Sequence, residues 1–494
     1  MIFIRTFLAA SLHLGLAALS ATAEPSVYNR HRDHVLGTSL NLVVVAGTEA
    51  EADRAEAAVL GEIERLSAIL STYDPGSEVS KLNAASKVKV SPDLVRVLTS
   101  CESFRQSSGN AMSCRIGKAL TIWDKAEKQG KVPDRADLRL VSGQAGRADV
   151  AIDPASGSVT RPEAVQFRID ALAKGYIIDK ALRAGRDAAP GADGLLLNIG
   201  GDQLAWGRGP HNGKWRTGIS TFSADAAGIG VPVLAYSAGA LATSGPGPRD
   251  RVIDGQHFGH IVSPADGWPV SGKQRASVYA RDAMTADALA TALMVMDISD
   301  GIALAEGLKG VEALIRADDG RTYQTSGWQA LQEPAAKLAA AKAPPWPKGY
   351  SLAVDLEIPD LRVAKYERPY VAAWIADTDG KLVRILMLAG DEPRWMEENY
   401  YWFRRFGRKA GSLVDAMSGP TRRPGRYTLV WDGLDHDGNA AGPGTHILHV
   451  EAAREHGEHQ HESIELEFGT GAFTKAAEPG AELGRIAVRF GAQP

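Results

Sequence analysis

The sequence predicts an α+β (mixed α/β) domain followed by an all-β, immunoglobulin-like sandwich domain. The chain has 494 residues, which is too long for one ordinary hydrophobic core and indicates two or three domains. Helix-like and strand-like hydrophobic patterns are mixed in the first two thirds of the chain. From residue 349 onward, short alternating runs are joined by Asp-Gly and Pro-Gly turns, which is typical of a β-sandwich. These runs are residues 351–358, 370–375, 382–388, 425–431, 445–450 and 462–468.

The N-terminus has the pattern of a secretory signal peptide. Arg5 supplies a positive charge, residues 7–19 are mostly apolar, and Ala-Thr-Ala at 21–23 is a cleavage site. The apolar run is too short to span a bilayer, although a retained anchor is the alternative. We therefore expect an exported periplasmic protein. Its expected parts are a signal peptide at 1–23, a first domain at 24–343, a Pro-rich linker at 344–348 and a β domain at 349–494.

Composition restricts the class of protein. Hydrophobic residues make up 44% and charged residues 23% of the chain, as in globular proteins, and the net charge of -4 argues against nucleic-acid binding. The two cysteines, Cys101 and Cys114, both lie in the exported part, where a disulfide is permitted. The sequence leaves open whether they come within bonding distance.

Local patterns predict the elements of the first domain. A strand entered through a Gly turn is expected at 34–45, and helices at 49–70, at 92–109 and from 170 towards 183. Residues 71–83 have the turn chemistry of a loop, and short strands are expected between 140 and 170. Further strands are predicted at 195–199, 215–219, 232–237 and 260–262, and a helix at 286–292.

Asp287 and Thr291 are the candidate metal ligands. They are spaced i and i+4 on the predicted helix, so a carboxylate and a hydroxyl lie one turn apart on one face and can share a hard cation. The alternative is that Asp287 only complements the dipole at the start of the helix, while Thr291 bonds a preceding carbonyl.

Six short motifs occur in a fixed order along the chain. They are Ser-Thr-Tyr-Asp-Pro-Gly-Ser at 71–77, Ala-Lys-Gly-Tyr at 173–176, Asn-Ile-Gly-Gly-Asp at 198–202, Ala-Thr-Ser-Gly at 242–245, His-Ile-Val-Ser-Pro at 260–264 and Ala-Asp-Ala-Leu-Ala-Thr at 286–291. Together they resemble the FAD:protein FMN transferase (ApbE) family over roughly residues 34–310. Neither a dinucleotide-binding Gly-x-Gly-x-x-Gly nor a P-loop is present, so a Rossmann-type FAD site is not supported.

The resemblance implies a site for FAD and Mg²⁺. The expected metal ligands are Asp287, Thr291 and the main-chain carbonyl of Ala171, and the expected catalytic residues are His260 and Asp287. Lys174 is expected to contact phosphate, or alternatively to be a solvated charge on its helix. The expected FAD-contacting positions are Gly37, Tyr73, Ala111, Met112, Ser113, Lys174, Thr243, Ser244, Gly245 and Arg249.

Two segments depart from the family pattern. Where the family usually has Gly-Ala-Phe-Asp, this chain has Asn110 to Ser113, so Met112 and Ser113 replace an aromatic ring and a carboxylate. The family usually has a carboxylate six residues before the lysine that corresponds to Lys174. In this chain Arg168 occupies that position, and the carboxylate of Asp170 lies four residues before the lysine. The changes at Met112 and Ser113 favour the alternative of a non-catalytic, exported flavin-binding or interaction protein, whereas the presence of Asp287, Thr291 and His260 favours an enzyme.

The resemblance implies that FAD is split at its pyrophosphate, FMN moves to a Thr or Ser hydroxyl of a partner protein, and AMP leaves. A neutral imidazole suits the role of base, which is assigned to His260, with His257 as a possible substitute. The alternative is that His260 only bonds the turn that follows it. A second alternative is hydrolysis of FAD to FMN and AMP. The expected partner is an exported or membrane-bound redox protein carrying a flavinylation Thr or Ser, and membrane contact is expected only through this acceptor.

The β domain looks like an uncharacterised domain that often accompanies exported flavin transferases. It contains a histidine-rich stretch at 456–461, with His456, His459 and His461. These side chains are candidates for binding a divalent metal, and a solvated hairpin tip is the alternative.

Overall fold

The computed structural model describes residues 25–218, 233–246, 250–332, 350–361, 363, 368–390, 399–407, 418–419, 424–431, 433–435, 440–454, 457–469 and 471–492. The first domain is built on an antiparallel sheet with the strand order β1-β2-β6-β7-β10-β13-β14-β15. Each strand in this order pairs antiparallel with the next. The strands are β1 (Ser26–Val35), β2 (Thr38–Ala46), β6 (Ala192–Ile199), β7 (Asp202–Gly207), β10 (Gly239–Ser244), β13 (Lys273–Ala280), β14 (Glu312–Ala317) and β15 (Thr322–Gln324).

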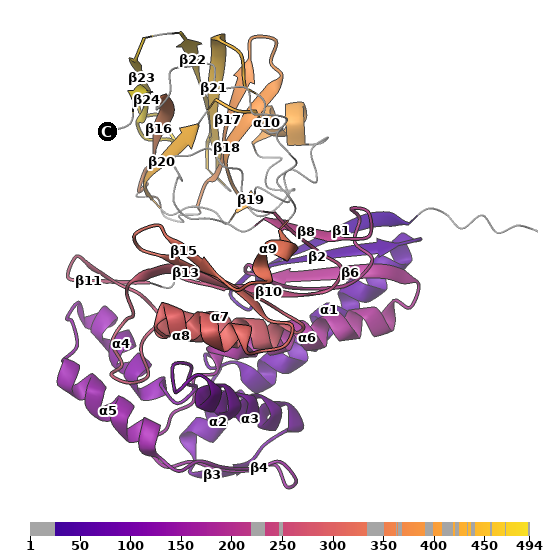
Figure 1. The fold of residues 1–494 in the computed structure, drawn as a ribbon, viewed down its shortest axis with the longest axis vertical. Coiled ribbons are helices and arrows are strands. Elements are labelled where there is room, and N and C mark those ends of the chain that lie inside the picture. Colours follow the sequence, from indigo (N-terminus) through magenta and orange to yellow (C-terminus); the bar gives the residue numbers. More distant parts are fainter. Residues whose placement is uncertain are drawn as a thin grey trace, which may run out of the picture.

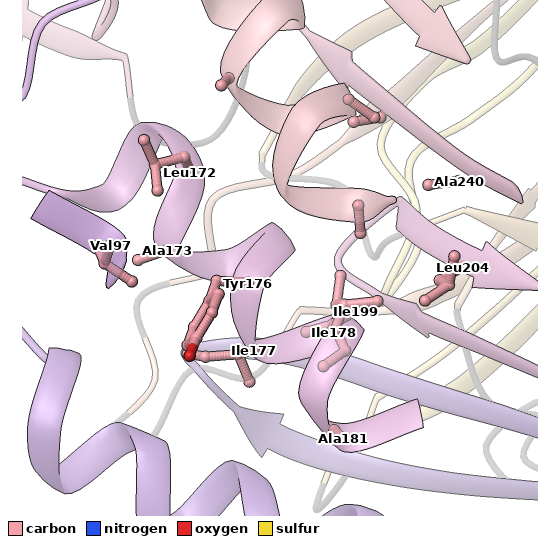
Figure 2. Packing of buried hydrophobic residues seen from close by; sticks show 14 of the residues in the cluster. Val97, Leu172, Ala173, Tyr176, Ile177, Ile178, Ala181, Ile199, Leu204 and Ala240 are labelled. Carbon is pink, nitrogen blue, oxygen red and sulfur yellow. The ribbon is translucent and has the colours of Figure 1, made fainter. Parts of the chain in front are cut away.

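Helices cover one face of this sheet (Figure 1). The helices on this side of the sheet are α1 (Glu49–Leu70), α2 (Glu78–Ala84), α3 (Pro92–Ser107), α4 (Gly117–Gln129), α5 (Arg135–Arg147), α6 (Asp170–Ala188), α7 (Ala283–Val295) and α8 (Ile298–Glu306), whereas α9 (Trp328–Leu331) lies on the other face. Figure 2 shows the buried side chains of α6 packed between Val97 of α3 and the sheet residues Ile199, Leu204 and Ala240. The core therefore lies between α6 and the sheet, and α6 is fixed on both sides.

The other face of the sheet has a smaller core. A hairpin of β8 (Trp215–Gly218) and β9 (Val233–Tyr236) and the helix α9 supply Trp215, Leu234 and Trp328, which pack on Val45 and Leu196 of the sheet. Two small sheets complete the domain: β3 (Lys87–Lys89), β5 (Ser158–Thr160) and β4 (Ala151–Asp153), and the hairpin β11 (Arg251–Ile253) with β12 (Gln256–Phe258).

Several sequence-based assignments are confirmed and others are wrong. The helix at 49–70 is confirmed at both ends, with Thr48 accepting the Glu51 amide as its N-cap. The predicted loop at 71–83 contains α2, because Ser77 caps that helix by accepting the Ser80 amide. The helix α5 was missed, since only Leu138, Ser142 and Ala145 are buried on it and its apolar pattern is short. Residues 260–262 form no strand, because the hairpin ends at Phe258.

The second domain consists of two β-sheets. One sheet has the order β20-β16-β24-β23 and the other β19-β18-β17-β21-β22, and their inner faces share one hydrophobic core. All six predicted runs are strands, whereas β19, β23 and β24 were missed. The strands are β16 (Tyr350–Ile358), β17 (Tyr370–Asp377), β18 (Leu382–Ala389), β19 (Ser418–Gly419), β20 (Gly425–Trp431), β21 (Gly444–Ala453), β22 (His459–Phe468), β23 (Phe473–Ala477) and β24 (Ile486–Ala492).

A short helical segment, α10 (Tyr400–Trp402) with the π-helical turn η2 (Phe403–Gly407), packs on the outer side of the second sheet through Trp402 and Trp374. The predicted signal peptide and linker lie outside the described residues. None of the helices in the described part of the chain combines the length and hydropathy needed to cross a membrane.

Candidate active site

Asp287 lies at the contact between α6 and α7. Its side chain is buried, and its Oδ2 accepts the amide of Gly175 at 3.0 Å. The N-cap of α7 is Asp282, which accepts the Thr285 amide, so the alternative that Asp287 merely starts the helix is wrong. The carboxylate of Asp287 is therefore directed across the helix pair, towards the first turns of α6.

Gly175 makes this contact possible. A Cβ added at Gly175 would lie 2.2 Å from the carbonyl oxygen of Ala283, so a larger residue would force α6 and α7 apart. In a regular α-helix the amide of residue 175 points at the carbonyl of Ala171. Because the same amide reaches Asp287, the carboxylate is brought beside the Ala171 carbonyl.

Thr291 extends the row of oxygen atoms by one turn of α7. Its Oγ1 lies 3.3 Å from the Oγ of Ser244, at the end of β10. Asp287, Thr291 and the Ala171 carbonyl are all hard oxygen donors, and Mg²⁺ in phosphate-handling sites is typically held by one or two carboxylates plus substrate phosphate. No group of three or more His, Cys, Asp or Glu side chains positioned for a metal occurs among the described residues. The donor set present thus fits a magnesium ion that substrate helps to hold.

Lys174 lies in an ion pair beside this row. Its Nζ is 2.6 Å from Oδ2 of Asp202, whose side chain is almost fully buried, and Oδ1 of Asp202 accepts the amide of Thr243 at 3.2 Å. The alternative of a solvated charge on the helix is therefore wrong. Thr243 Oγ1 in turn lies 2.9 Å from Ser277 Oγ on β13. Asp202 links α6 to β7 and β10, and places the ammonium group near the end of β10.

His260 follows the β11–β12 hairpin in an irregular segment. Its Nδ1 lies 2.7 Å from Oδ1 of Asp250, and its amide donates to the same oxygen at 2.9 Å. Both side chains are largely buried, with exposed fractions of 17% and 13%. The alternative that His260 only bonds the turn after it is wrong, since its ring is bonded to the residue before the hairpin. His257 is exposed on β12.

Tyr73 lies on the loop between α1 and α2 with 71% of its surface exposed. The guanidinium of Arg168 lies 5.2 Å from its ring centroid, and Arg168 Nε bonds Asp170 Oδ2 at 3.2 Å. Asp170 Oδ1 accepts the hydroxyl of Thr72 at 3.0 Å. Arg168 and Asp170, which differ from the family pattern before the lysine, thus support the loop that carries the exposed tyrosine ring.

The segment at 110–113 has its own arrangement. Asn110 has a left-handed backbone with φ of 71°, and Ala111 lines a cavity of about 570 Å³ together with residues 263–265 and the end of α7. Met112 is fully buried in the main core, and Ser113 Oγ accepts the Arg115 amide. The adjacent Cys114 forms a disulfide with Cys101, with Cα atoms 5.8 Å apart.

The remaining predicted positions are placed as follows. Gly37 has φ of +77° in the β1–β2 turn, and a Cβ added there would have no neighbour within 4 Å. Gly245 directly follows β10, and Arg249 lies outside the described residues. Asp202 and Asp250 were not predicted as site residues. Asp202 ends a motif that the sequence analysis recognised, so it could have been predicted. The contact between Asp250 and His260 depends on the β11–β12 hairpin, which was not predicted although the Asp-Gly pair at 254–255 is a local signal for such a turn.

Comparisons with known proteins identify the family of the first domain. The model of the ApbE family matches residues 36–315, and the model of a predicted periplasmic protein family, DUF2271, matches residues 351–485. The chain is 27% identical over 338 residues to the FAD:protein FMN transferase of Treponema pallidum, covering 63% of this chain and 91% of that protein. It is 26% identical over 275 residues to the FAD:protein FMN transferase of Vibrio cholerae, covering 54% and 81%.

Solved structures show the same fold. The crystal structure of the ApbE protein of Thermotoga maritima has a TM-score of 0.55 at 26% identity, and the match covers 62% of this chain and 100% of that one. The flavin transferase ApbE of Vibrio cholerae has a TM-score of 0.54 at 23% identity and covers 62% and 99%. Because the family model matches more than half of the sequence, this chain belongs to the ApbE family, with a DUF2271 domain at its C-terminal end.

Proposed function

We propose that the protein transfers FMN from FAD to a Thr or Ser hydroxyl of an exported acceptor protein, in a Mg²⁺-dependent reaction that releases AMP. The chain is an enzyme of the FAD:protein FMN transferase family. The observation that carries the proposal is the meeting of Asp287 with the first turns of α6 at Gly175, which gathers oxygen donors beside Lys174. Oxygen donors that hold Mg²⁺, together with the positive charge of a lysine, suit the binding of the phosphates of a dinucleotide.

Asp287, Thr291 and the Ala171 carbonyl are the proposed ligands of Mg²⁺. When bound, the ion supplies positive charge that neutralises the phosphate oxygens during phosphoryl transfer. Lys174 adds a second positive charge, and Asp202 keeps its ammonium group at the end of β10. The row of donors also explains why only one carboxylate is needed from the protein.

His260 is the proposed base. Its imidazole takes the proton of the acceptor hydroxyl while that oxygen bonds to the phosphorus of the FMN moiety and the bond to AMP breaks. The nucleophile is a neutral hydroxyl, so removal of its proton accompanies the attack.

We further propose how FAD is bound. Tyr73 is proposed to stack on the isoalloxazine; the exposure of its ring and its contact with Arg168 support this role. Ala111, which lines the cavity, is proposed to contact FAD through its main chain, a kind of contact that does not depend on the side chains at the next two positions. The full proposed set is Gly37, Tyr73, Ala111, Met112, Ser113, Lys174, Thr243, Ser244, Gly245 and Arg249.

The protein is proposed to act in the periplasm, after removal of residues 1–23. The name of the DUF2271 family, a predicted periplasmic protein, supports this location. The acceptor is then an exported or membrane-bound redox protein, and membrane contact occurs only through it. The proposed domain division is 24–343, a linker at 344–348, and an immunoglobulin-like sandwich at 349–494, whose two sheets share one core.

The test uses the mature chain, residues 24–494, with FAD, Mg²⁺ and an acceptor domain that carries a flavinylation Thr. Mass spectrometry reads the FMN adduct and AMP. An adduct that disappears with EDTA supports the proposal. AMP without adduct indicates an FAD pyrophosphatase, and neither product with several acceptors indicates a flavin-binding protein without this chemistry.

A further inference from the structure

A single carboxylate oxygen holds His260 at two points. Oδ1 of Asp250 lies 2.7 Å from the ring Nδ1 and 2.9 Å from the main-chain nitrogen of the same histidine. An ionised carboxylate only accepts hydrogen bonds, so a neutral imidazole bonded to it carries its proton on Nδ1. One contact fixes the backbone at His260 and the other fixes the ring.

We propose that Asp250 is the positioning residue of His260, holding the imidazole as the Nδ1–H tautomer so that Nε2 carries the lone pair that acts as base. This inference rests on the proposed function, and it adds a residue that the sequence motifs did not include. When Nε2 has taken the proton of the acceptor hydroxyl, the ring becomes a cation whose charge the carboxylate of Asp250 stabilises. The proton stays on Nε2, and the electron pair of the broken P–O bond leaves with AMP.

The β11–β12 hairpin brings Asp250 and His260 together. Its register pairs Arg251 with Phe258 and Ile253 with Gln256, which leaves Asp254 and Gly255 as a two-residue turn. Both turn residues have positive φ, 50° and 71°, as the common two-residue hairpin turns require. The residues just outside the paired ends of the hairpin are therefore neighbours. Asp250 lies on one side and residues 259–260 on the other, so Asp250 and His260, which we call the dyad, are in contact although they are ten positions apart in sequence.

The base of the hairpin is anchored to α4. Arg251, which is 8% exposed, donates from Nη2 to Asp124 Oδ1 at 2.7 Å, and its Nε lies 3.7 Å from Glu127 Oε2. On the opposite strand, the ring of Phe258 packs on Trp123 with centroids 5.1 Å apart. Asp250 and His260 thus extend from a fixed base, which suits a residue pair whose geometry must be maintained during the reaction.

The test combines turnover with a direct reading of the tautomer. Protein labelled with ¹⁵N-histidine is examined by long-range ¹H–¹⁵N correlation, with the His260 signals assigned from their loss in His260→Gln. The wild-type ring is expected as the Nδ1–H form, and Asp250→Asn is expected to lose that preference. For the transferase, Asp250→Asn is expected to lower kcat by about 100-fold, the lower end of what a general base contributes. KM for FAD should change by less than about 2-fold, because the lost interaction belongs to the transition state.

Two variants serve as controls. Asp254→Asn changes an exposed carboxylate on the same hairpin and keeps a residue that accepts positive φ, so its turnover and tautomer should match the wild-type protein. Asp250→Glu keeps the charge and should recover part of kcat. Thermal unfolding of each variant separates a folding defect from a change in the dyad.

The outcomes are distinct for the two proposals. If wild-type protein transfers FMN and Asp250→Asn keeps both its kcat and the Nδ1–H tautomer, the positioning role is wrong while the transferase stands. A loss of turnover with an unchanged tautomer also overturns it, because the ring is then held by other groups. If wild-type protein transfers FMN to no acceptor, the proposed function fails and the dyad has no reaction to serve, whatever the spectra show.

Discussion

The amide of Gly175 and the carboxylate of Asp287 are joined by a 3.0 Å hydrogen bond between two helices that are 112 positions apart in sequence at this contact. The bond forms at a close contact of α6 and α7, at the glycine whose Cβ would overlap Ala283. The bond gives one oxygen of the buried carboxylate a hydrogen-bond donor. It also brings the carboxylate beside the first turns of α6, where the carbonyl of Ala171 lies. The geometry of the candidate metal site therefore depends on a residue without a side chain.

Replacement of Asp287 by Asn is expected to remove magnesium binding and to lower FMN transfer by at least about 100-fold, because an amide oxygen lacks the charge that holds a hard cation. Isothermal titration of Mg²⁺ into protein with FAD and the adduct assay measure the two effects. Thr291 provides a matched pair of variants. Thr291→Ser keeps the hydroxyl and should retain activity, whereas the isosteric Thr291→Val should lose it; equal activities would remove Thr291 from the ligand set.

Replacement of Gly175 by Ala is expected to destabilise the first domain by about 1–3 kcal/mol or more, because the added methyl group meets main-chain atoms of Ala283 that cannot move aside easily. Urea unfolding monitored by circular dichroism measures the loss. Gly61 is the matched control, since it is also helical, in α1, and its Cβ position has no atom within 4 Å apart from its chain neighbours and the backbone of its own helix. Gly61→Ala should stabilise by up to about 1 kcal/mol. A neutral Gly175→Ala would show that the helix contact adapts.

Loss of the disulfide between Cys101 and Cys114 is expected to lower the free energy of unfolding by about 3 kcal/mol, the chain-entropy value for a closed loop of this length. Both cysteines are buried, so reduction should need prior unfolding. Unfolding curves of oxidised and reduced protein give the difference, with the Cys101→Ala/Cys114→Ala variant in both conditions as control. The bond lies next to residues 110–113, so FAD affinity should fall as well. Curves that coincide would contradict the expectation.

The β domain is expected to lose stability in acid through His449. This ring stacks on Trp374 with centroids 4.8 Å apart, and its Nδ1 lies 3.1 Å from Nε2 of His461. Burial, and next the charges of His461 and Arg405, lower the pKa of His449 to about 4. A histidine with a lowered pKa contributes stability that is present above its unfolded value of 6.5 and is lost as pH falls through 4. Tryptophan fluorescence from pH 7 to pH 4 should report this loss.

His449→Phe should be less sensitive to acid over the same range, because the ring then has no proton to bind. The exposed His257 of the first domain is the control, and His257→Asn should leave the acid transition unchanged. If the wild-type transition and that of His449→Phe coincide, the acid sensitivity resides elsewhere.

The packing of the histidine-rich stretch corrects the alternative of a solvated hairpin tip, since His459 bonds the buried Glu451 at 2.6 Å and His461 stacks on Tyr401. His456 lies outside the described residues.

Asp179 gives a pH dependence of opposite sign. It accepts the amides of Ala283 and Met284 at the start of α7, and burial raises its pKa from 3.8 to about 7. A carboxyl group with a raised pKa contributes stability that is present below 3.8 and is lost as pH rises through about 7. Asp179→Asn should therefore gain stability relative to wild type between pH 4 and pH 8 in calorimetry. A constant difference over this range would contradict the prediction.

The sequence by itself located the long helices and most strands of the β domain, but it did not predict β7, β10, β13, β14 and β15 of the main sheet. The period of 3.6 residues located α1 to within a residue, and the alternation of apolar residues located six strands of the β domain. It also singled out Asp287 and Thr291, because i and i+4 spacing is a local property of a helix. It failed at α5, whose buried face is small, and at residues 260–262, where an expected strand is an irregular segment held by Asp250.

Only the tertiary structure decided which groups meet. The approach of Asp287 to α6, the pairing of Lys174 with Asp202, the bond of Asp250 to His260 and the joining of the two cysteines each connect residues from separate elements or from the two sides of a hairpin. Such contacts follow from the register of strands and the close packing of helices. Because these are set by the whole core more than by neighbours in sequence, a local signal exists only for the hairpin that joins Asp250 and His260, in its Asp-Gly turn.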